Sequence, residues 1–498
     1  MKNIKNNISL IIILSIFVGC SDVVEFDPHD EYEVTEVDYL QTESDYETMA
    51  VSCYTPTQWL NQLVVIGDIA SDNAVAGGEN ASDVVALQQI DDYTILTNNS
   101  TLEDLWKSAY EGVNRTNYLI SYKDVNLLGE TVEFDGKEAL YGEVYFLRAY
   151  YYFNLVRMFG DVVLFTDHKL GLSDFGTLQR SPKEDVYAQI ETDLLSAISV
   201  LPTSASQQGR VTKYAAQALL GKVYLYQEKF DEAASMLENV VNGPFSLVSN
   251  FDDIFLLEGE NGPESVYEVQ YSNGQPYYNW SGQTRGQGNY AVQQCGVRGL
   301  NGTAEMPYNA GWSTNLPTQD LAAAYEDGDQ RKDATTFDVE AYATNNPDLG
   351  VTYQVAPYKN TDLYNKKYLP RKGQTSGQVE LNYENNQRII RYSDVLLMAA
   401  EANLRSSSPN ASKAQGYLDQ VRDRAFGDSD HRVTATVDAV WNERRLELAM
   451  EGDRFFDLVR TGQAATVLGS GYNPATNGLF PIPQNEIEIS NLTQNDGY

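Results

Sequence analysis

The string Leu220-Gly221-Lys222-Val223-Tyr224 is the clearest structural signal in this chain. It matches the L-G-x-x-Y pattern of a repeat that pairs two antiparallel helices, in which the glycine lets the helices approach closely. Ala233, Leu237 and Pro244 follow at or near the spacing expected for the second helix. The pattern therefore predicts a helix pair over residues 213–241, with the tyrosine and the alanine filling the seam.

Further helices are predicted before this pair. Apolar residues recur at i, i+3 and i+4 over residues 103–122 and 137–159, which is typical of one-sided helices. A third helix is expected to begin with Ser181 as its N-cap and Pro182 at its first position. It should end near residue 201, because Pro202 cannot continue a helix.

The middle of the chain has a different composition. Residues 271–312 contain eight glycines in 42 positions, against 36 in all 498, and they are rich in tyrosine and tryptophan. No helical stripe is present, so we expect long loops with short strands such as residues 265–270. Loops of this length in a compact protein are usually functional.

Together these patterns predict a mostly α protein, in which a tetratricopeptide-like helical stack packs against an irregular, loop-rich half with short strands. Helices near 391–405 and 412–425 would add a fourth pair to the stack. We expect one globule over residues 39–498. Its parts are N-terminal helical repeats (39–244), a loop-rich ligand-binding region (245–384), and C-terminal helices with a proline-containing segment (385–498).

The N-terminus predicts export and lipid attachment. Two lysines precede an apolar run over residues 8–18 that is too short to span a bilayer, as in a secretory signal peptide (1–19). Phe17-Val18-Gly19-Cys20 resembles a bacterial lipobox, in which the cysteine is acylated and becomes the first residue of the mature chain. The alternative is an ordinary signal followed by a chance cysteine. A lipid on Cys20 would anchor the protein without crossing the membrane.

Charge and cysteine content narrow the function classes. The net charge of −35 argues against nucleic acid as a partner, because phosphate binding needs basic patches. It also disfavours a polyanionic glycan, unless a local basic pocket overrides the global field. Cys53 and Cys295 could form one disulfide or remain as two buried thiols.

Three strings near the C-terminus resemble one known family. They are residues 388–402 (RIIRYSDVLLMAAEA), 443–460 (ERRLELAMEGDRFFDLVR) and 480–487 (FPIPQNEI). Together with 145–149 (YFLRA) and 159–164 (FGDVVL), they are similar to the SusD/RagB family of Bacteroidetes outer-membrane lipoproteins, and the resemblance runs from Cys20 to Tyr498. Val163 and Asp496 stand where the family often has proline. An acidic leader over residues 20–38, which carries no lysine or arginine, resembles the export signal of surface lipoproteins or is a solvated linker.

The charges in the second string predict a structural role. Glu443, Arg444, Glu447, Glu451 and Arg454 stand three to four residues apart, so we expect a helix whose ion pairs run along its own surface. Gly452 would permit a helix end or a close contact.

The sequence offers few reactive groups. It has three histidines, and none lies in an H-E-x-x-H motif; G-x-S-x-G and Walker-type strings are also missing. Asp327-Gly328-Asp329 begins like a calcium loop, but Arg331 follows where an acid is needed, so we interpret it as a polar turn. We predict no catalytic residues, no metal and no cofactor.

Aromatic residues indicate a binding site instead. Sugar rings stack their C–H faces on tryptophan and tyrosine, while amides and carboxylates bond the hydroxyl groups. The 271–312 stretch supplies both kinds of residue, and the candidates are Trp280, Trp312, Tyr277, Tyr278, Tyr290 and Asn279. The alternative is that these rings only pin the loops to the globule. Trp106 and Trp441 are predicted to lie in the core, and Trp59 is ambiguous.

A second loop is a weaker candidate. Asp72 and Asn73 lie in Ser71-Asp72-Asn73 after an early helix, in a region that helps to line the ligand site in relatives by resemblance. They would bond sugar hydroxyls. The alternative is a helix-capping Ser-Asp-Asn turn.

The resemblance implies a function. It suggests a non-enzymatic, cell-surface, lipid-anchored protein of the outer membrane that binds oligosaccharides and delivers them to a SusC-like TonB-dependent transporter. The alternatives are a RagB-like subunit that binds peptides for a similar transporter and a surface glycoside hydrolase. The hydrolase would require two carboxylates about 5–10 Å apart in an open cleft.

Overall fold

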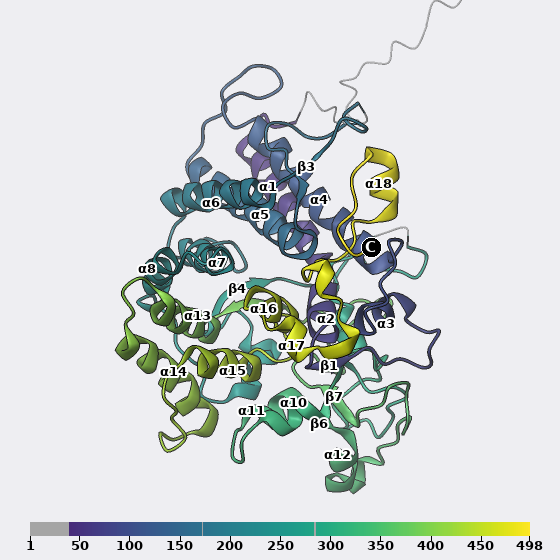
Figure 1. Ribbon diagram of the computed structural model, residues 1–498. Coiled ribbons are helices and arrows are strands. Elements are labelled where there is room, and N and C mark those ends of the chain that lie inside the picture. Colours follow the sequence, from purple (N-terminus) through teal and green to yellow (C-terminus); the bar gives the residue numbers. More distant parts are fainter. Residues whose placement is uncertain (1–38, 172, 283–284) are drawn as a thin grey trace, which may run out of the picture.

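The computed structural model describes residues 39–171, 173–282 and 285–498 (Figure 1). It confirms the predicted mostly α fold, with helices far outnumbering short strands. The predicted signal peptide, Cys20 and the acidic leader all fall within residues 1–38 and lie outside the described residues. The predicted division at residues 244 and 384 stays a prediction.

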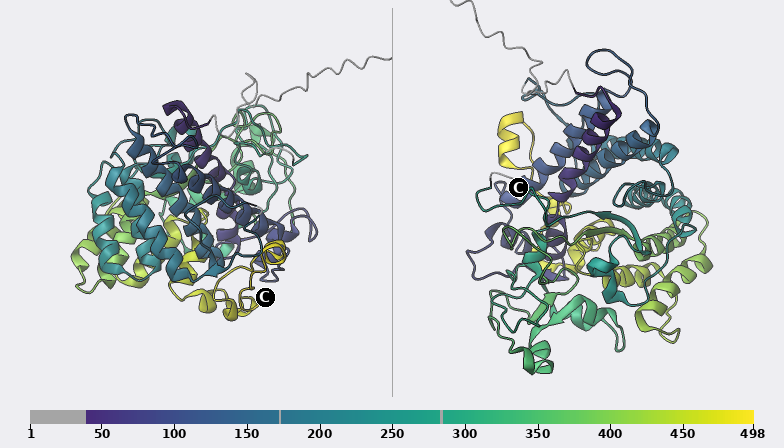
Figure 2. Two further views of the ribbon diagram at one scale, coloured as in Figure 1. Left: turned by 90° about the horizontal axis from the view of Figure 1, so that it is seen from above. Right: turned by 180° about the vertical axis from the view of Figure 1, so that it is seen from behind.

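The helices pack one after another in an arc along one side of the molecule (Figure 1). In packing order they are α1 (Glu43–Gln58), α4 (Ser100–Ser121), α5 (Lys137–Phe159), α6 (Lys183–Val200), α7 (Lys213–Tyr226), α8 (Phe230–Val241), α13 (Tyr392–Arg405) and α14 (Ala411–Phe426). These bounds agree with the predicted helices, including the fourth pair. Figure 2 shows the loop-rich segments gathered on the side away from this arc.

Gly221 explains why α7 and α8 can pair so closely. A Cβ atom at this position would lie 2.5 Å from the side chain of Leu237 on α8, so only glycine fits. Tyr224 and Ala233 are both buried. The predicted close approach at Gly221 is confirmed, and the filling of the seam by Tyr224 and Ala233 stays a prediction.

The predicted start of α6 is wrong in detail. Ser181 belongs to strand β3 (Arg180–Ser181), which pairs antiparallel with β2 (Val162–Val163), and Pro182 occupies the N-cap position without a side-chain cap. The amide of Lys183 instead donates to Asp161 Oδ1 at 2.9 Å. Because Ser181 pairs in strand β3, the carboxylate of Asp161, which lies between α5 and β2, bonds the first amide of the helix instead.

Two strands join distant parts of the chain. Strand β4 (Ser265–Val269) pairs antiparallel with β8 (Gln387–Arg391), and the pair packs on α7.

Between these strands the loop-rich part also contains short elements that periodicity did not predict: α9 (Ala291–Cys295), β5 (Leu316–Pro317), α10 (Gln319–Ala324), α11 (Arg331–Thr335), β6 (Thr336–Asp338), α12 (Val339–Asn345) and β7 (Leu363–Asn365). β5 pairs with β1 (Ala74–Val75) and β6 with β7. This part has a small hydrophobic core of its own, which includes Val297, Tyr308 and Phe337.

The acidic and basic string 443–460 does not form one helix. Helix α15 (Val437–Glu447) ends at Glu447, a turn follows, and α16 (Arg454–Arg460) begins after it. The predicted ion pairs along a helix surface are therefore wrong. The partners come from other elements, because the chain turns these charges inward.

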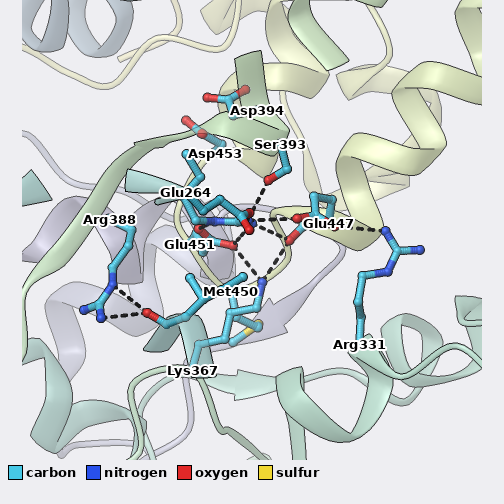
Figure 3. A network of polar contacts seen from close by, with 12 residues as sticks. Glu264, Arg331, Lys367, Arg388, Ser393, Asp394, Glu447, Met450, Glu451 and Asp453 are labelled. Carbon is cyan, nitrogen blue, oxygen red and sulfur yellow. Dashed lines mark hydrogen bonds and ion pairs between the residues drawn. The ribbon is translucent and has the colours of Figure 1, made fainter. Parts of the chain in front are cut away.

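A buried ion-pair network forms around this turn (Figure 3). Arg391, the last residue of β8, contacts Glu264 at 2.6 Å, Glu447 at 2.8 Å and Glu451 at 2.7 Å. Lys367 contacts Glu451 at 2.7 Å. These five side chains are at most 4 % exposed.

The network extends to α11 and α14 through Glu447. Arg331 lies 3.1 Å from one oxygen of this carboxylate, and Arg424 lies 2.5 Å from the other. Burial alone would raise the pKa of Glu447, but the guanidinium groups of Arg424, Arg391 and Arg331 lower this pKa well below its usual range.

The turn after α15 also touches helix α2 (Gln62–Ile69) at close range. A Cβ on Gly67 would lie 1.9 Å from the carbonyl oxygen of Gly452, whose own φ of +89° favours glycine. The amide of Gly452 donates to the buried Asp68 at 3.2 Å. The expected close contact at Gly452 is therefore present.

The sequence also predicted the environments of three further tryptophans and of two cysteines. Trp106 is buried, as predicted, whereas Trp441 is only partly buried, with the Arg405 guanidinium 5.7 Å from its ring. Trp59 is buried, and its ring lies 5.2 Å from the guanidinium of Arg115. Cys53 and Cys295 are free and buried, so the disulfide alternative is wrong.

Glu447→Gln should lower the free energy of unfolding at pH 7 by about 3–5 kcal/mol, because it removes the one buried negative charge that Arg391, Arg424 and Arg331 share. The folded pKa of Glu447 lies below its unfolded value of about 4.3. This carboxylate therefore stabilises the fold above that pH and loses its effect as the pH falls. Urea unfolding at pH 7, 5, 4 and 3 should show the difference between variant and wild type shrinking below pH 5.

Glu111→Gln is the matched control, since it breaks an exposed i,i+4 pair with Arg115. It should change the free energy of unfolding by no more than about 0.5 kcal/mol. Equal effects of the two substitutions would contradict a central role for the buried network.

Candidate functional site

Two tryptophans from separate segments lie next to each other. The rings of Trp280 and Trp312 have centroids 5.7 Å apart and planes inclined by 42°. The Trp280 side chain is 60 % exposed, and Trp312 is half-buried. The sequence predicted both residues as candidates, and the fold places them on one surface.

Trp312 is held by the backbone around it. Its amide donates to the carbonyl of Gln293, a residue of α9, at 2.7 Å. Its carbonyl accepts from Arg298 at 2.7 Å, and the same guanidinium group contacts Asp83 at 2.7 Å. These contacts hold the loop before α3 (Val85–Asp91) beside the surface formed by Trp280 and Trp312, which we call the tryptophan surface.

Trp280 is held by the loop that precedes β8. Its indole N–H donates to Glu380 at 3.2 Å. Asn382, which is fully buried, accepts from the amide of Tyr278 at 2.8 Å and donates to the carbonyl of Tyr278 at 3.1 Å and to that of Gln378 at 3.0 Å. These bonds clamp the Trp280 loop to residues 378–382.

The predicted tyrosines lie close to this loop. The rings of Tyr278 and Tyr290 meet edge to face at 5.5 Å, and burial raises the pKa of Tyr290 well above its usual range. The ring of Tyr277 packs on Gly377, where a Cβ would lie about 2.9 Å from it. Asn279 accepts from the amide of Ser281 at 3.1 Å and so shapes the turn around Trp280. Ligand contacts of these four residues stay predictions.

Asp72 and Asn73 do not fit the role of hydroxyl ligands. Asp72 accepts from Arg454 at 2.7 Å and also pairs with Arg445 at 3.0 Å. Asn73 is fully buried, and its Oδ1 accepts from Arg445 at 3.0 Å. Their oxygens are therefore used to join the early loop to α15 and α16.

Sequence reasoning missed the residues that position the tryptophans. Asp83, Arg298, Glu380 and Asn382 carry no local motif. The only signal was the amide-rich run Asn382-Tyr383-Glu384-Asn385-Asn386. Buried amides need hydrogen-bond partners, so such a run next to a strand indicates a clamped backbone.

The rim of the tryptophan surface carries carboxylates. Glu380 bonds the Trp280 indole, Asp83 pairs with the Arg298 that bonds the Trp312 carbonyl, and the exposed Glu79 lies 3.9 Å from Arg298. Arg298 is already bonded to Asp83 and to the carbonyl of Trp312. The arrangement suits a ligand without negative charge.

The described residues give no sign of metal chemistry. They contain no group of three or more His, Cys, Asp or Glu side chains that could hold a metal ion. Asp329, from the polar turn considered above, is buried and pairs with Arg331 at 2.7 Å. No helix within the same part of the chain is long and apolar enough to cross a membrane.

Comparison with known proteins identifies the family. Residues 28–225 match a family model described as "Starch-binding associating with outer membrane", and residues 263–478 match the model of the SusD family. A solved structure named "Laminarin binding SusD-like protein" is 34 % identical, with a TM-score of 0.81, covering 92 % of this chain and all of that one. The chain belongs to the SusD/RagB family.

Other SusD-like proteins are similar over nearly the whole length. The structure of surface glycan-binding protein A from Bacteroides thetaiotaomicron in complex with laminarihexaose is 26 % identical, with a TM-score of 0.80, and the match covers 91 % of this chain and 99 % of that one. SusD-like protein P2 of Formosa agariphila is 26 % identical over 533 residues, which cover 99 % of this chain and 100 % of the relative. The two structures are named as binding proteins, in agreement with the predicted absence of enzymatic activity.

Asn382→Leu should free the Trp280 loop, because a side chain of similar shape then leaves the polar backbone groups of Tyr278 unpaired. We expect the amides of residues 273–282 to exchange hydrogen at least tenfold faster, and the free energy of unfolding to fall by about 1–3 kcal/mol. Hydrogen–deuterium exchange measures the first effect without any ligand.

Asn346→Leu is the control, since it removes a single side-chain bond at 2.8 Å at the end of α12. Exchange over 273–282 should not change in this variant. Unchanged exchange there in Asn382→Leu would show that the clamp does not hold the loop.

Proposed function

We propose that this protein is a cell-surface glycan-binding subunit that captures neutral oligosaccharides and delivers them to a SusC-like TonB-dependent transporter. The observation that carries the proposal is the pair formed by Trp280 and Trp312, with ring centroids 5.7 Å apart on a partly exposed surface. It is non-enzymatic in this role.

The geometry of the rings supports a sugar chain as the ligand. Sugars present apolar C–H faces, and an exposed indole offers a large rigid surface for them. Because the two ring planes are inclined by 42°, they suit a chain that curves across both rings. The clamp through Asn382 fixes this geometry before the ligand arrives, which reduces the entropy cost of binding.

Charge supports a neutral ligand. Glu380 bonds the Trp280 indole, Asp83 and Glu79 lie near Arg298 beside the Trp312 backbone, and the whole chain carries a net charge of −35. A sulfated or uronic-acid chain would be repelled both at the site and during its approach. The relatives add a first choice of ligand: laminarin and laminarihexaose appear in the names of two similar structures.

The peptide-binding alternative fits the surface less well. A peptide site would favour polar grooves that bond the backbone over aromatic platforms. The described surface has a tryptophan that is 60 % exposed beside a second one, with Val379, also exposed, next to Glu380. This arrangement favours the glycan.

The N-terminal sequence and the family support the proposed lipid anchoring of the protein and its delivery of ligand to a transporter. The lipobox-like sequence ends in Cys20, and one matching family model describes proteins that associate with the outer membrane. An acylated Cys20 followed by a leader of 18 residues, 21–38, would hold the globule at the outer-membrane surface beside a transporter.

Trp280→Ala and Trp312→Ala should each weaken binding of laminarihexaose at least tenfold, a loss of more than about 1 kcal/mol, while the fold persists. Trp106→Ala should instead lower the free energy of unfolding by about 3–5 kcal/mol, because its ring is buried, with little change in affinity per folded molecule. Calorimetric titration and thermal melts on the three variants separate these effects. Normal binding by both surface variants would refute the proposed site.

Cys20→Ala should release the protein from the membrane, because the acyl chain is the proposed anchor. Labelling with a fatty-acid probe, followed by fractionation, measures both acylation and release. Ser21→Ala, which leaves the cysteine in place, is the control. Equal label on wild type and Cys20→Ala would rule out this site of acylation.

A further inference from the structure

We propose that a second carbohydrate-binding site lies in an aromatic cavity formed by Tyr93, Tyr472 and Tyr498. The cavity has a volume of about 350 Å³, within the range of small-molecule sites. It shares no lining residue with the tryptophan surface. The inference rests on the proposed sugar-binding function and adds a separate location for it.

The cavity has an apolar floor. Phe455, on α16, and Phe480 are buried, and their rings stack with centroids 5.4 Å apart and planes inclined by 29°. At the rim, Leu96 is 55 % exposed and Tyr498 is 37 % exposed. These exposed side chains give the cavity an apolar rim above its apolar floor.

All three tyrosines line the cavity, and Tyr93 and Tyr498 bond their hydroxyl groups to backbone carbonyls of the protein. Tyr93 donates to the carbonyl of Ala70 at 2.8 Å, and Tyr498 donates to that of Leu479 at 2.9 Å. The ring of Tyr472 meets that of Tyr93 edge to face at 5.7 Å. With their hydroxyl groups engaged, these residues offer ring surfaces, which suit the C–H face of a sugar.

Tyr93 is held in a strained conformation. Its φ is +52°, which is costly for a bulky residue. Lys359 bonds Asp91 at 2.5 Å and Asp92 at 2.6 Å, and so fixes the two residues before it. The surrounding structure therefore maintains a conformation that turns this ring toward Tyr472.

Polar groups for sugar hydroxyls lie at the mouth. Asn473 is exposed, its Oδ1 accepts from the amide of Ala475 at 3.1 Å, and within the described chain its amide nitrogen has no hydrogen-bond partner. The exposed Thr94 adds a hydroxyl group from the opposite loop. A floor of rings with one amide and one hydroxyl at the edge is the chemistry expected for a single sugar unit at a chain end.

The test uses the full chain and a panel of neutral hexasaccharides that includes laminarihexaose. Saturation-transfer NMR detects weak binding, and calorimetry gives the number of sites. Wild type should bind at two sites. The double variant Trp280→Ala/Trp312→Ala should keep one weaker site, and adding Tyr472→Ala to it should abolish the remaining signal.

Two further variants keep the result interpretable. Leu96→Arg changes an exposed rim residue and should weaken the second site at least fivefold without lowering the melting temperature. Tyr145→Ala, at a half-buried tyrosine on α5 outside the cavity, should leave both sites intact.

The outcomes distinguish the two proposals. Loss of all binding in the folded tryptophan double variant would overturn the second site and leave the first in place. Residual binding that survives both Tyr472→Ala and Leu96→Arg would also overturn it. If no member of the panel binds to wild type, both the proposed function and this second site are wrong.

Discussion

The ion pairs of Arg391 join three separate segments of the chain in the protein interior. Its guanidinium group is buried at the end of β8 and contacts Glu264 beside β4, Glu447 at the end of α15 and Glu451 in the next turn. Burying a guanidinium group is costly unless carboxylates with good geometry surround it. In the structure α15 ends at Glu447 and the chain turns, and both Glu447 and Glu451 face this one cation.

One short segment of the chain connects the ion-pair network of Arg391 to the tryptophan surface. Asn382 and Arg391 are nine residues apart, and the segment between them carries both the clamp on the Trp280 loop and strand β8. Anchoring β8 in the ion-pair network fixes where Asn382 lies. A loop with many glycines can then present Trp280 at a fixed distance from Trp312, because its order comes from these contacts and needs no helix of its own.

The two proposed sugar sites use the same physical device. In both, protein groups satisfy the polar atoms of the aromatic side chains: Glu380 bonds the indole of Trp280, and backbone carbonyls bond the hydroxyl groups of Tyr93 and Tyr498. The rings are thereby held with their faces available, so little conformational entropy remains to be lost on binding. The sites differ in shape, since the tryptophans form an open surface and the tyrosines enclose a cavity.

The sequence alone determined the helical stack and the identity of the exposed aromatic candidates. The apolar periodicity of α4 and α5 acts over one or two helical turns, and Gly221 meets Leu237 on the next helix along the chain, so spacing within the sequence predicts them. Only the tertiary structure decided which charges pair, that Asp161 rather than Ser181 caps α6, and that Asp72 and Asn73 serve α15 and α16. It also placed Trp280 beside Trp312 and assembled Tyr93 with Tyr472. These contacts join residues from 20 to almost 400 positions apart, and the energy of a hydrogen bond or an ion pair depends on where the partner lies in space, which local periodicity does not encode.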